Sequence, residues 1–135
     1  MNLISLRIIT DDVNGLADFY ERVIGVPAAR QGDVFAEIGT PSGTLAIGST
    51  ATVGLFAPGS AHPADNHSII IELLVDDVDT EYTRLGEWID AFVTEPKTMP
   101  WGNRSLLFRD PDGNLVNLFT PVTPEAMEKF ARFER

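Results

Sequence analysis

Apolar residues in this chain fall into short runs and amphipathic stretches, and their order predicts a structure of mixed strands and helices. Residues 3–9 are apolar or β-branched apart from Ser5 and Arg7, which predicts a strand. Asp12 can cap a helix over residues 13–24, in which apolar side chains recur at helical spacing. Three further strands and one short extended piece are predicted at residues 28–31, 34–38, 44–48 and 53–57.

The second half of the chain repeats this pattern after a segment rich in turn formers, residues 58–66, which we interpret as a linker. A β-branched strand over residues 67–75 leads through Asp77 into a helix that ends near residue 87. Thr123 has the position of a cap for a final helix. The predicted order is βαβββ, linker, βαβββ and a C-terminal helix, with the remaining strands at residues 91–95, 104–108 and 115–119.

Two short motifs recur in the same order in both halves, which indicates an internal duplication. Asp11-Asp12-Val13 returns 65 residues later as Asp76-Asp77-Val78. Pro41-Ser42-Gly43-Thr44-Leu45 returns 70 residues later as Pro111-Asp112-Gly113-Asn114-Leu115. The later copy combines proline, aspartate and glycine in the way that tight hairpin turns require.

Composition narrows the classes of partner. The 135 residues contain no cysteine, which excludes a disulfide framework and thiolate chemistry. A net charge of −10 repels phosphate backbones, so we expect no nucleic-acid partner. The same charge would favour a cationic ligand. The alternative explanation of the charge, which we prefer, is that an acidic surface maintains solubility. No apolar run approaches the roughly 20 residues of a membrane helix, and no signal peptide is recognisable. We therefore expect no membrane partner and a cytoplasmic location.

Together these motifs resemble the vicinal oxygen chelate superfamily, which contains glyoxalase I, extradiol dioxygenases, fosfomycin-resistance enzymes and bleomycin-resistance proteins. The resemblance rests on Asp12, Phe19-Tyr20 and Ile24-Gly25 in the first half, and on Val75-Asp76-Asp77-Val78-Asp79 and Asp110-Pro111-Asp112-Gly113-Asn114 in the second. It implies an α+β domain of paired βαβββ modules whose curved mixed sheets form a cup around a ligand, commonly completed by a homodimer. We accordingly expect one domain, with modules at residues 1–57 and 67–120 and a C-terminal helix within residues 121–135.

The resemblance also implies a divalent metal in the cup, held by His, Glu or Gln on the first and last strands of each module. The corresponding positions in this sequence are Ser5, Ile47, Ile70 and Asn117. Isoleucine has no donor atom, and serine and asparagine are weak neutral ligands. We therefore predict that the metal site is lost and that no cofactor is bound.

Strand alternation gives the other side chains that would line the cup. If Ser5 and Ile70 face it, so do Arg7 and Glu72, which either neutralise each other as an ion pair or serve a polar ligand. Asn117 either orients a ligand or bonds to neighbouring backbone. Trp101 either stacks on an aromatic or cationic ligand or packs at a domain or dimer edge. Less specific lining candidates are Phe35, Glu37 and Phe56.

Three functions remain open. The first, which we prefer, is a metal-independent small-molecule-binding protein similar to the drug-sequestering resistance proteins, with a drug or metabolite as its ligand. The second is a glyoxalase-like lyase or isomerase that uses Glu72 as a general acid or base without a metal. The third is a structural or regulatory dimer with a collapsed cup.

Overall fold

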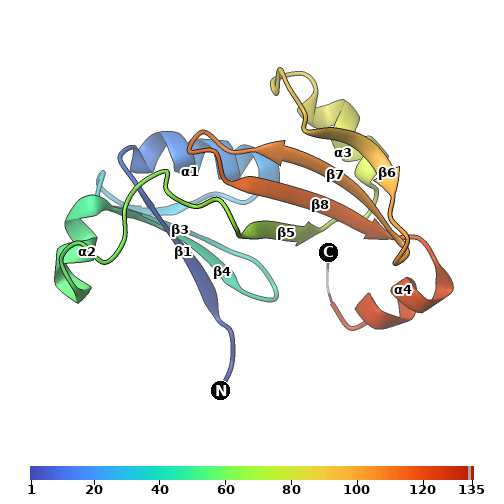
Figure 1. Ribbon diagram of the computed structural model, residues 1–135, viewed down its shortest axis with the longest axis horizontal. Coiled ribbons are helices and arrows are strands. Elements are labelled where there is room, and N and C mark those ends of the chain that lie inside the picture. The colour runs from blue at the N-terminus through green and yellow to red at the C-terminus, as the bar shows by residue number, and fades with distance from the viewer. Residues whose placement is uncertain (134) are drawn as a thin grey trace. The chain divides into compact units, whose positions relative to one another are not determined.

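The computed structural model describes residues 1–133 and 135, which form two compact units (Figure 1). One unit comprises residues 1–66 with 111–113, and the other comprises residues 67–110 with 114–135. The elements confirm the predicted α+β class and the repeated βαβββ order. They are β1 (Ser5–Thr10), α1 (Val13–Ile24), β2 (Ala29–Gln31), β3 (Phe35–Gly39), β4 (Thr44–Ser49), α2 (Thr50–Phe56), β5 (Ile70–Leu74), α3 (Val78–Leu85), β6 (Thr94–Thr98), β7 (Asn103–Arg109), β8 (Leu115–Pro121) and α4 (Pro124–Phe130).

The first sheet has the strand order β1-β4-β3-β2, with β1 and β4 parallel and the other pairs antiparallel. Helix α1 packs on one side of this sheet because its apolar stripe, which includes Leu16 and Tyr20, is fully buried there. The Asp12 side chain caps the helix by accepting a 2.9 Å hydrogen bond from the Gly15 N–H. Gly25 ends it in the left-handed conformation, with φ of 78°.

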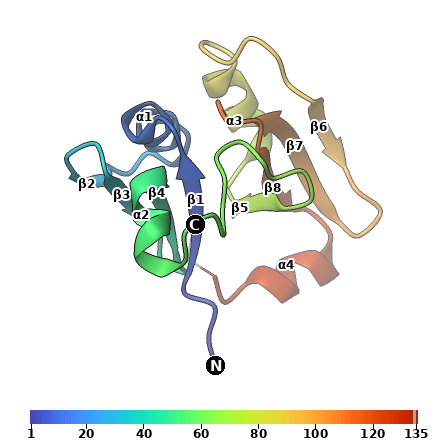
Figure 2. The ribbon, with the colours of Figure 1, turned by 60° about the vertical axis from the view of Figure 1, so that its left-hand side comes forward.

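Helix α2 is an element that the sequence did not predict. Residues 53–57 were expected to be extended, but α2 runs through Thr50–Phe56 and follows β4 without a loop. Thr52 Oγ1 donates a 2.7 Å hydrogen bond to the Ser49 carbonyl, and Thr52 and Val53 are buried. Their packing therefore overrides the strand preference of β-branched residues. Figure 2 shows α2 beside strands β1 and β4, which it contacts.

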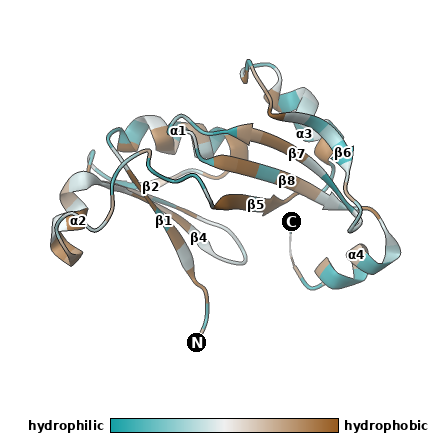
Figure 3. Ribbon diagram, viewed as in Figure 1, coloured by the Kyte–Doolittle hydropathy of each residue, from teal (hydrophilic) through white to brown (hydrophobic). Residues whose placement is uncertain are grey.

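The second sheet repeats the topology of the first, in the order β5-β8-β7-β6. The length of each strand depends on the extent of its pairing. The sequence predicted a strand over residues 67–75, but β5 pairs with β8 only from Ile70 to Leu74. Pairing with β7 likewise places β6 at Thr94–Thr98 rather than residues 91–95. The hydropathy colouring of Figure 3 shows β5 in brown, as expected for a strongly apolar strand.

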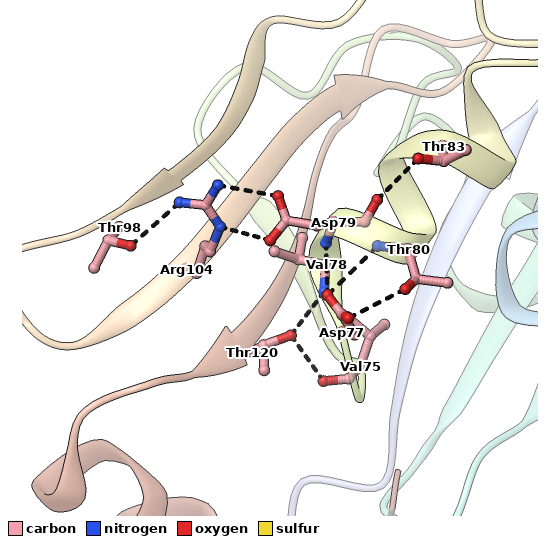
Figure 4. Close-up of polar contacts among 9 residues, drawn as sticks. All are labelled: Val75, Asp77, Val78, Asp79, Thr80, Thr83, Thr98, Arg104 and Thr120. Atoms are coloured by element: carbon pink, nitrogen blue, oxygen red, sulfur yellow. Dashed lines mark hydrogen bonds and ion pairs between the residues drawn. The ribbon is translucent and has the colours of Figure 1, made fainter.

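Polar contacts attach the start of α3 to the sheet (Figure 4). Asp77 caps the helix by accepting from the backbone N–H groups of the next turn. Thr120 on β8 accepts from the Val78 N–H and donates to the Val75 carbonyl. The Arg104 guanidinium donates to both carboxylate oxygens of Asp79, at 2.8 and 3.0 Å, and this pairing holds the pKa of Asp79 below its ordinary value.

Helix α4 lies on the side of the second sheet opposite α3 and begins, as predicted, at the Thr123 cap (Figure 1). Its Phe130 ring stacks edge-on against Phe119 of β8, with centroids 5.1 Å apart. The fit requires Gly102, because a Cβ there would lie 2.1 Å from the Thr123 hydroxyl oxygen. In the described part of the chain, none of the helices combines the length and the apolar character of a bilayer-spanning segment.

Candidate ligand-binding site

Each sheet has one side turned away from its βαβ helix, and we call this side the front face of that sheet. Paired residues on neighbouring strands point to the same side, so the strand register identifies the residues of each front face. In the first sheet, Arg7 pairs with Ala46, which pairs with Glu37. The adjacent row consists of Ile9, Gly48 and Phe35, and Ser5 lies one row beyond Arg7 in the other direction.

Ile47 does not belong to this front face, and its assignment there was wrong. It pairs with Ile8 on one side and with Ala36 on the other, and its side chain is 0% exposed in the layer that packs on α1. Ala46 takes the position that we assigned to Ile47. The physical reason is the length of the turns: four residues separate the paired ends of β3 and β4, and five separate those of β7 and β8. Matching the turns by their glycines therefore shifted the register by one residue.

Arg7 lies on the edge strand β1 of the first front face and contacts two aromatic rings. Its guanidinium carbon lies 5.0 Å from the centroid of Phe35 and 5.3 Å from that of Phe56. Phe35 comes from the adjacent row, and Phe56 comes from the end of α2. The side chains of a strand, a second strand and a short helix thus converge at one point. Phe35 and Phe56 were both less specific lining candidates in the sequence, but the position of Phe56 at the end of a helix was not predicted.

The second front face contains the other polar pair. Glu72, Asn117 and Leu107 form one row across β5, β8 and β7. The Asn117 Nδ2 donates a 2.8 Å hydrogen bond to Glu72 Oε2. Asn117 is only 9% exposed, and among the described residues its Oδ1 atom has no hydrogen-bond partner. The pair therefore contains two different acceptors, the exposed carboxylate of Glu72 and the buried carbonyl oxygen of Asn117.

Apolar side chains flank this pair on the same face. Ile70 lies one row away and is 48% exposed, and Leu74 lies one row away in the opposite direction. Leu74 pairs with Phe119, whose ring contacts Phe130 of α4. Phe130 was not identified from the sequence as a residue that would border the row of Glu72 and Asn117.

The structure bears on two alternatives that the sequence left open, the ion pair between Arg7 and Glu72 and the hydrogen-bond partner of Asn117. Arg7 and Glu72 belong to different units, and each has its contacts within its own unit, with aromatic rings and with Asn117 respectively. Asn117 bonds to a side chain rather than to the neighbouring backbone that we had considered as the alternative. Trp101 lies in the turn between β6 and β7 and is 68% exposed. In the described residues it makes no ring contact or hydrogen bond that would link it to Glu72 or Asn117.

The donor set at these positions does not fit a divalent transition metal. With the register corrected, the positions that the resemblance assigns to metal ligands are Ser5, Ala46, Ile70 and Asn117. They carry a hydroxyl, a methyl, a branched alkyl group and an amide, respectively. Glu72 is one carboxylate, whereas protein sites for such ions use several imidazole, carboxylate or thiolate ligands. Over residues 1–133 and 135, no group of three or more His, Cys, Asp or Glu side chains comes together.

Comparisons with known proteins agree with this architecture. The model of the family described as Glyoxalase/Bleomycin resistance protein/Dioxygenase superfamily matches residues 2–118. Among solved structures, a glyoxalase/bleomycin resistance protein/dioxygenase from Nocardioides is 22% identical with a TM-score of 0.74, over 92% of this chain and 85% of that chain. A family enzyme from Burkholderia phytofirmans PsJN is 17% identical with a TM-score of 0.76, over 90% and 100%. A lactoylglutathione lyase from Agrobacterium tumefaciens is 19% identical with a TM-score of 0.66, over 87% and 92%. No curated protein matches the chain.

Proposed function

The chain belongs to the Glyoxalase/Bleomycin resistance protein/Dioxygenase superfamily, and we propose that it binds a small organic molecule at Glu72 and Asn117 without a metal ion. The function is sequestration of a drug or metabolite by binding alone. The observation that carries this proposal is the buried Asn117 carbonyl oxygen, which has no partner among the described residues and lies beside an oriented carboxylate.

The chemistry of the two acceptors defines the ligand. A buried carbonyl oxygen without a partner costs about 1–3 kcal/mol, and a ligand N–H or O–H donor removes this cost. The Glu72 carboxylate accepts the strongest hydrogen bonds from charged donors, so an ammonium group is the donor that suits Glu72 best. The net charge of −10 raises the local concentration of cations around the protein.

Apolar surface beside the acceptors favours a ligand with an apolar or aromatic body. Ile70 and Leu74 share the second front face with Glu72, on either side of it. Ligand sites usually combine such walls with a few polar groups that fix orientation. A primary amine attached to a single ring, such as benzylammonium, is the smallest probe that uses both features.

A titration of isotope-labelled protein with benzylammonium tests the proposal. We expect the side-chain amide signals of Asn117 to shift with a dissociation constant of about 1 mM, a usual affinity for a molecule of this size. Glu72→Gln removes the charged acceptor and should weaken binding roughly tenfold or more, since a hydrogen bond to a charged group contributes about 1.5–3 kcal/mol. Glu87→Gln, a change at an exposed carboxylate elsewhere in the same unit, is the matched control. Unchanged Asn117 signals at saturating probe would refute the proposal.

A second candidate function is metal-independent lyase or isomerase chemistry, and the name of one structural neighbour, a lactoylglutathione lyase, favours it. In this proposal Glu72 holds or releases a proton at a carboxylate oxygen while Asn117 fixes its orientation. Lactoylglutathione turnover by the wild-type protein, lost in Glu72→Gln, would support it. Equal turnover by the two proteins, or none by either, would remove it.

We also propose that the protein forms a homodimer, an assembly common in proteins with this fold. Sedimentation velocity would show a species of twice the 14.8 kDa chain mass. A single monomeric species across the micromolar range would exclude this part of the proposal.

A further inference from the structure

The Arg7 side chain is held in an unusual environment for an exposed arginine. Its guanidinium faces two phenylalanine rings, at 5.0 Å from Phe35 and 5.3 Å from Phe56. Phe56 itself is 71% exposed, so the ring is not placed there by burial in the core of the unit. Contacts of this kind restrict the guanidinium but leave its N–H groups free, because a ring face accepts no conventional hydrogen bond in the guanidinium plane.

Gly48 provides the space that this arrangement needs. A Cβ atom at Gly48 would lie 3.4 Å from Arg7 Nη1 and 2.8 Å from Thr52 Oγ1. The glycine therefore lets both the guanidinium and helix α2 approach β4 closely. Arg7, Phe35 and Phe56 all belong to one compact unit, within which Gly48 allows this approach.

The charge on Arg7 is not neutralised by the part of the chain that the structure describes. Arg30 and Arg104 each form ion pairs with carboxylates, whereas Arg7 makes neither an ion pair nor a hydrogen bond with any described residue. This contrast is informative in a chain with 20 acidic and only 10 Lys and Arg residues. Glu37 is in the same row as Arg7, but strand β4, with Ala46, lies between their two strands.

We infer that Arg7, Phe35 and Phe56 form an anion subsite for a carboxylate carried on an aromatic or apolar body. The planar guanidinium presents parallel N–H donors that match the two oxygens of a carboxylate. The rings beside it supply apolar surface for the body of the ligand. This subsite goes beyond the proposed Glu72–Asn117 site, whose two acceptors repel a carboxylate.

Benzoate is the probe for this subsite, with acetate, inorganic phosphate and benzylammonium as comparison ligands. In a titration of the isotope-labelled full chain, we expect benzoate to shift the Arg7 Nε–Hε signal and the Gly48 amide with a dissociation constant of about 1 mM. Acetate, which lacks the ring, should bind at least several-fold more weakly. Phosphate binding at Arg7 more tightly than benzoate, or acetate equalling benzoate, would overturn the inferred ligand class.

Single substitutions distinguish the contribution of the Arg7 charge to benzoate binding from that of the aromatic rings. Arg7→Gln should weaken benzoate binding roughly tenfold or more, and Phe56→Leu should weaken it several-fold with Arg7 intact. Arg30→Gln, which removes an arginine already paired with Asp18 and Glu21 in the same unit, should leave the affinity unchanged. Equal benzoate affinity of wild type and Arg7→Gln would overturn the inference. Because benzylammonium reports on Asn117 and benzoate on Arg7, failure of one site is distinguishable from failure of the other.

Discussion

Asn117 on β8 and Glu72 on β5 occupy the same row of the second sheet and are joined by a 2.8 Å hydrogen bond from Nδ2 to Oε2. A carboxylate only accepts hydrogen bonds, so this contact determines which way the Asn117 amide points. Its carbonyl oxygen is then directed away from Glu72 and has no partner among residues 1–133 and 135. In the proposed function, a ligand donor supplies this missing partner.

Asn117→Leu separates this binding role from stability. The substitution removes a buried polar side chain with an unsatisfied oxygen and keeps a similar volume, while the exposed Glu72 carboxylate remains hydrated. We expect the free energy of unfolding to stay the same or to rise by up to about 1 kcal/mol, and benzylammonium binding to be lost. Urea unfolding measures the first quantity. A loss of more than about 2 kcal/mol would mean that Asn117 is chiefly structural.

Gly48→Ala tests the close packing around Arg7. The added Cβ would clash with Thr52 Oγ1 at 2.8 Å and crowd Arg7. We expect a loss of about 1–3 kcal/mol in thermal or urea unfolding, the usual range for overpacking.

Gly39→Ala is the matched control for this substitution, because a Cβ at Gly39 meets no atom within 4 Å. Both glycines belong to the first sheet. Equal effects of the two substitutions would contradict the packing described for Gly48, since a general effect of replacing glycine in a strand would then explain both.

Asp110→Ala tests the hairpin turn that precedes Asn117. The buried Asp110 carboxylate accepts from the backbone and side-chain amides of Asn114, at 2.9 and 2.8 Å. Removing it leaves these donors without that acceptor, and we expect a loss of about 1–3 kcal/mol. Asp33→Ala, at an exposed aspartate in another turn, should change the free energy of unfolding by less than about 0.5 kcal/mol.

The pH dependence of stability should report the Asp79–Arg104 pair. Hydrogen bonding from Arg104 lowers the pKa of Asp79 in the folded state, so the unfolded chain binds this proton more readily. The resulting stabilisation is present above the unfolded pKa and is lost as the pH falls through the lower, folded pKa. Arg104→Gln should therefore lose less stability than the wild type between pH 6 and pH 2 in acid titrations followed by circular dichroism. Identical pH profiles would show that the exposed pair contributes nothing measurable.

Much of the fold could be predicted because local signals agreed with the duplication. Asp12 and Asp77 both cap helices, and the turn between Asp110 and Asn114 joins two strands as expected. Arg7 and Glu72 occupy equivalent positions, each paired with the last strand of its module. The error at Ile47 arose because turn glycines align without revealing how many residues follow them before pairing begins.

The contacts around Arg7 could not be predicted from the sequence, for a different reason. Thr50–Phe56 contains threonine and valine, whose local preference favours strands, and only tertiary packing makes it helical. Without α2, Phe56 has no reason to lie over Arg7. Trp101 was more conspicuous in the sequence than Phe56; both are exposed, and it is the Phe56 ring that contacts Arg7.

Calorimetric titration of benzylammonium into protein treated with a chelator tests the central claim most directly. The account predicts a one-site isotherm with a dissociation constant of about 1 mM that excess EDTA leaves unchanged. It also predicts weakening by roughly tenfold or more in Glu72→Gln. Binding that disappears with the chelator, or an equal affinity in wild type and Glu72→Gln, would contradict a metal-independent ligand site at Glu72 and Asn117.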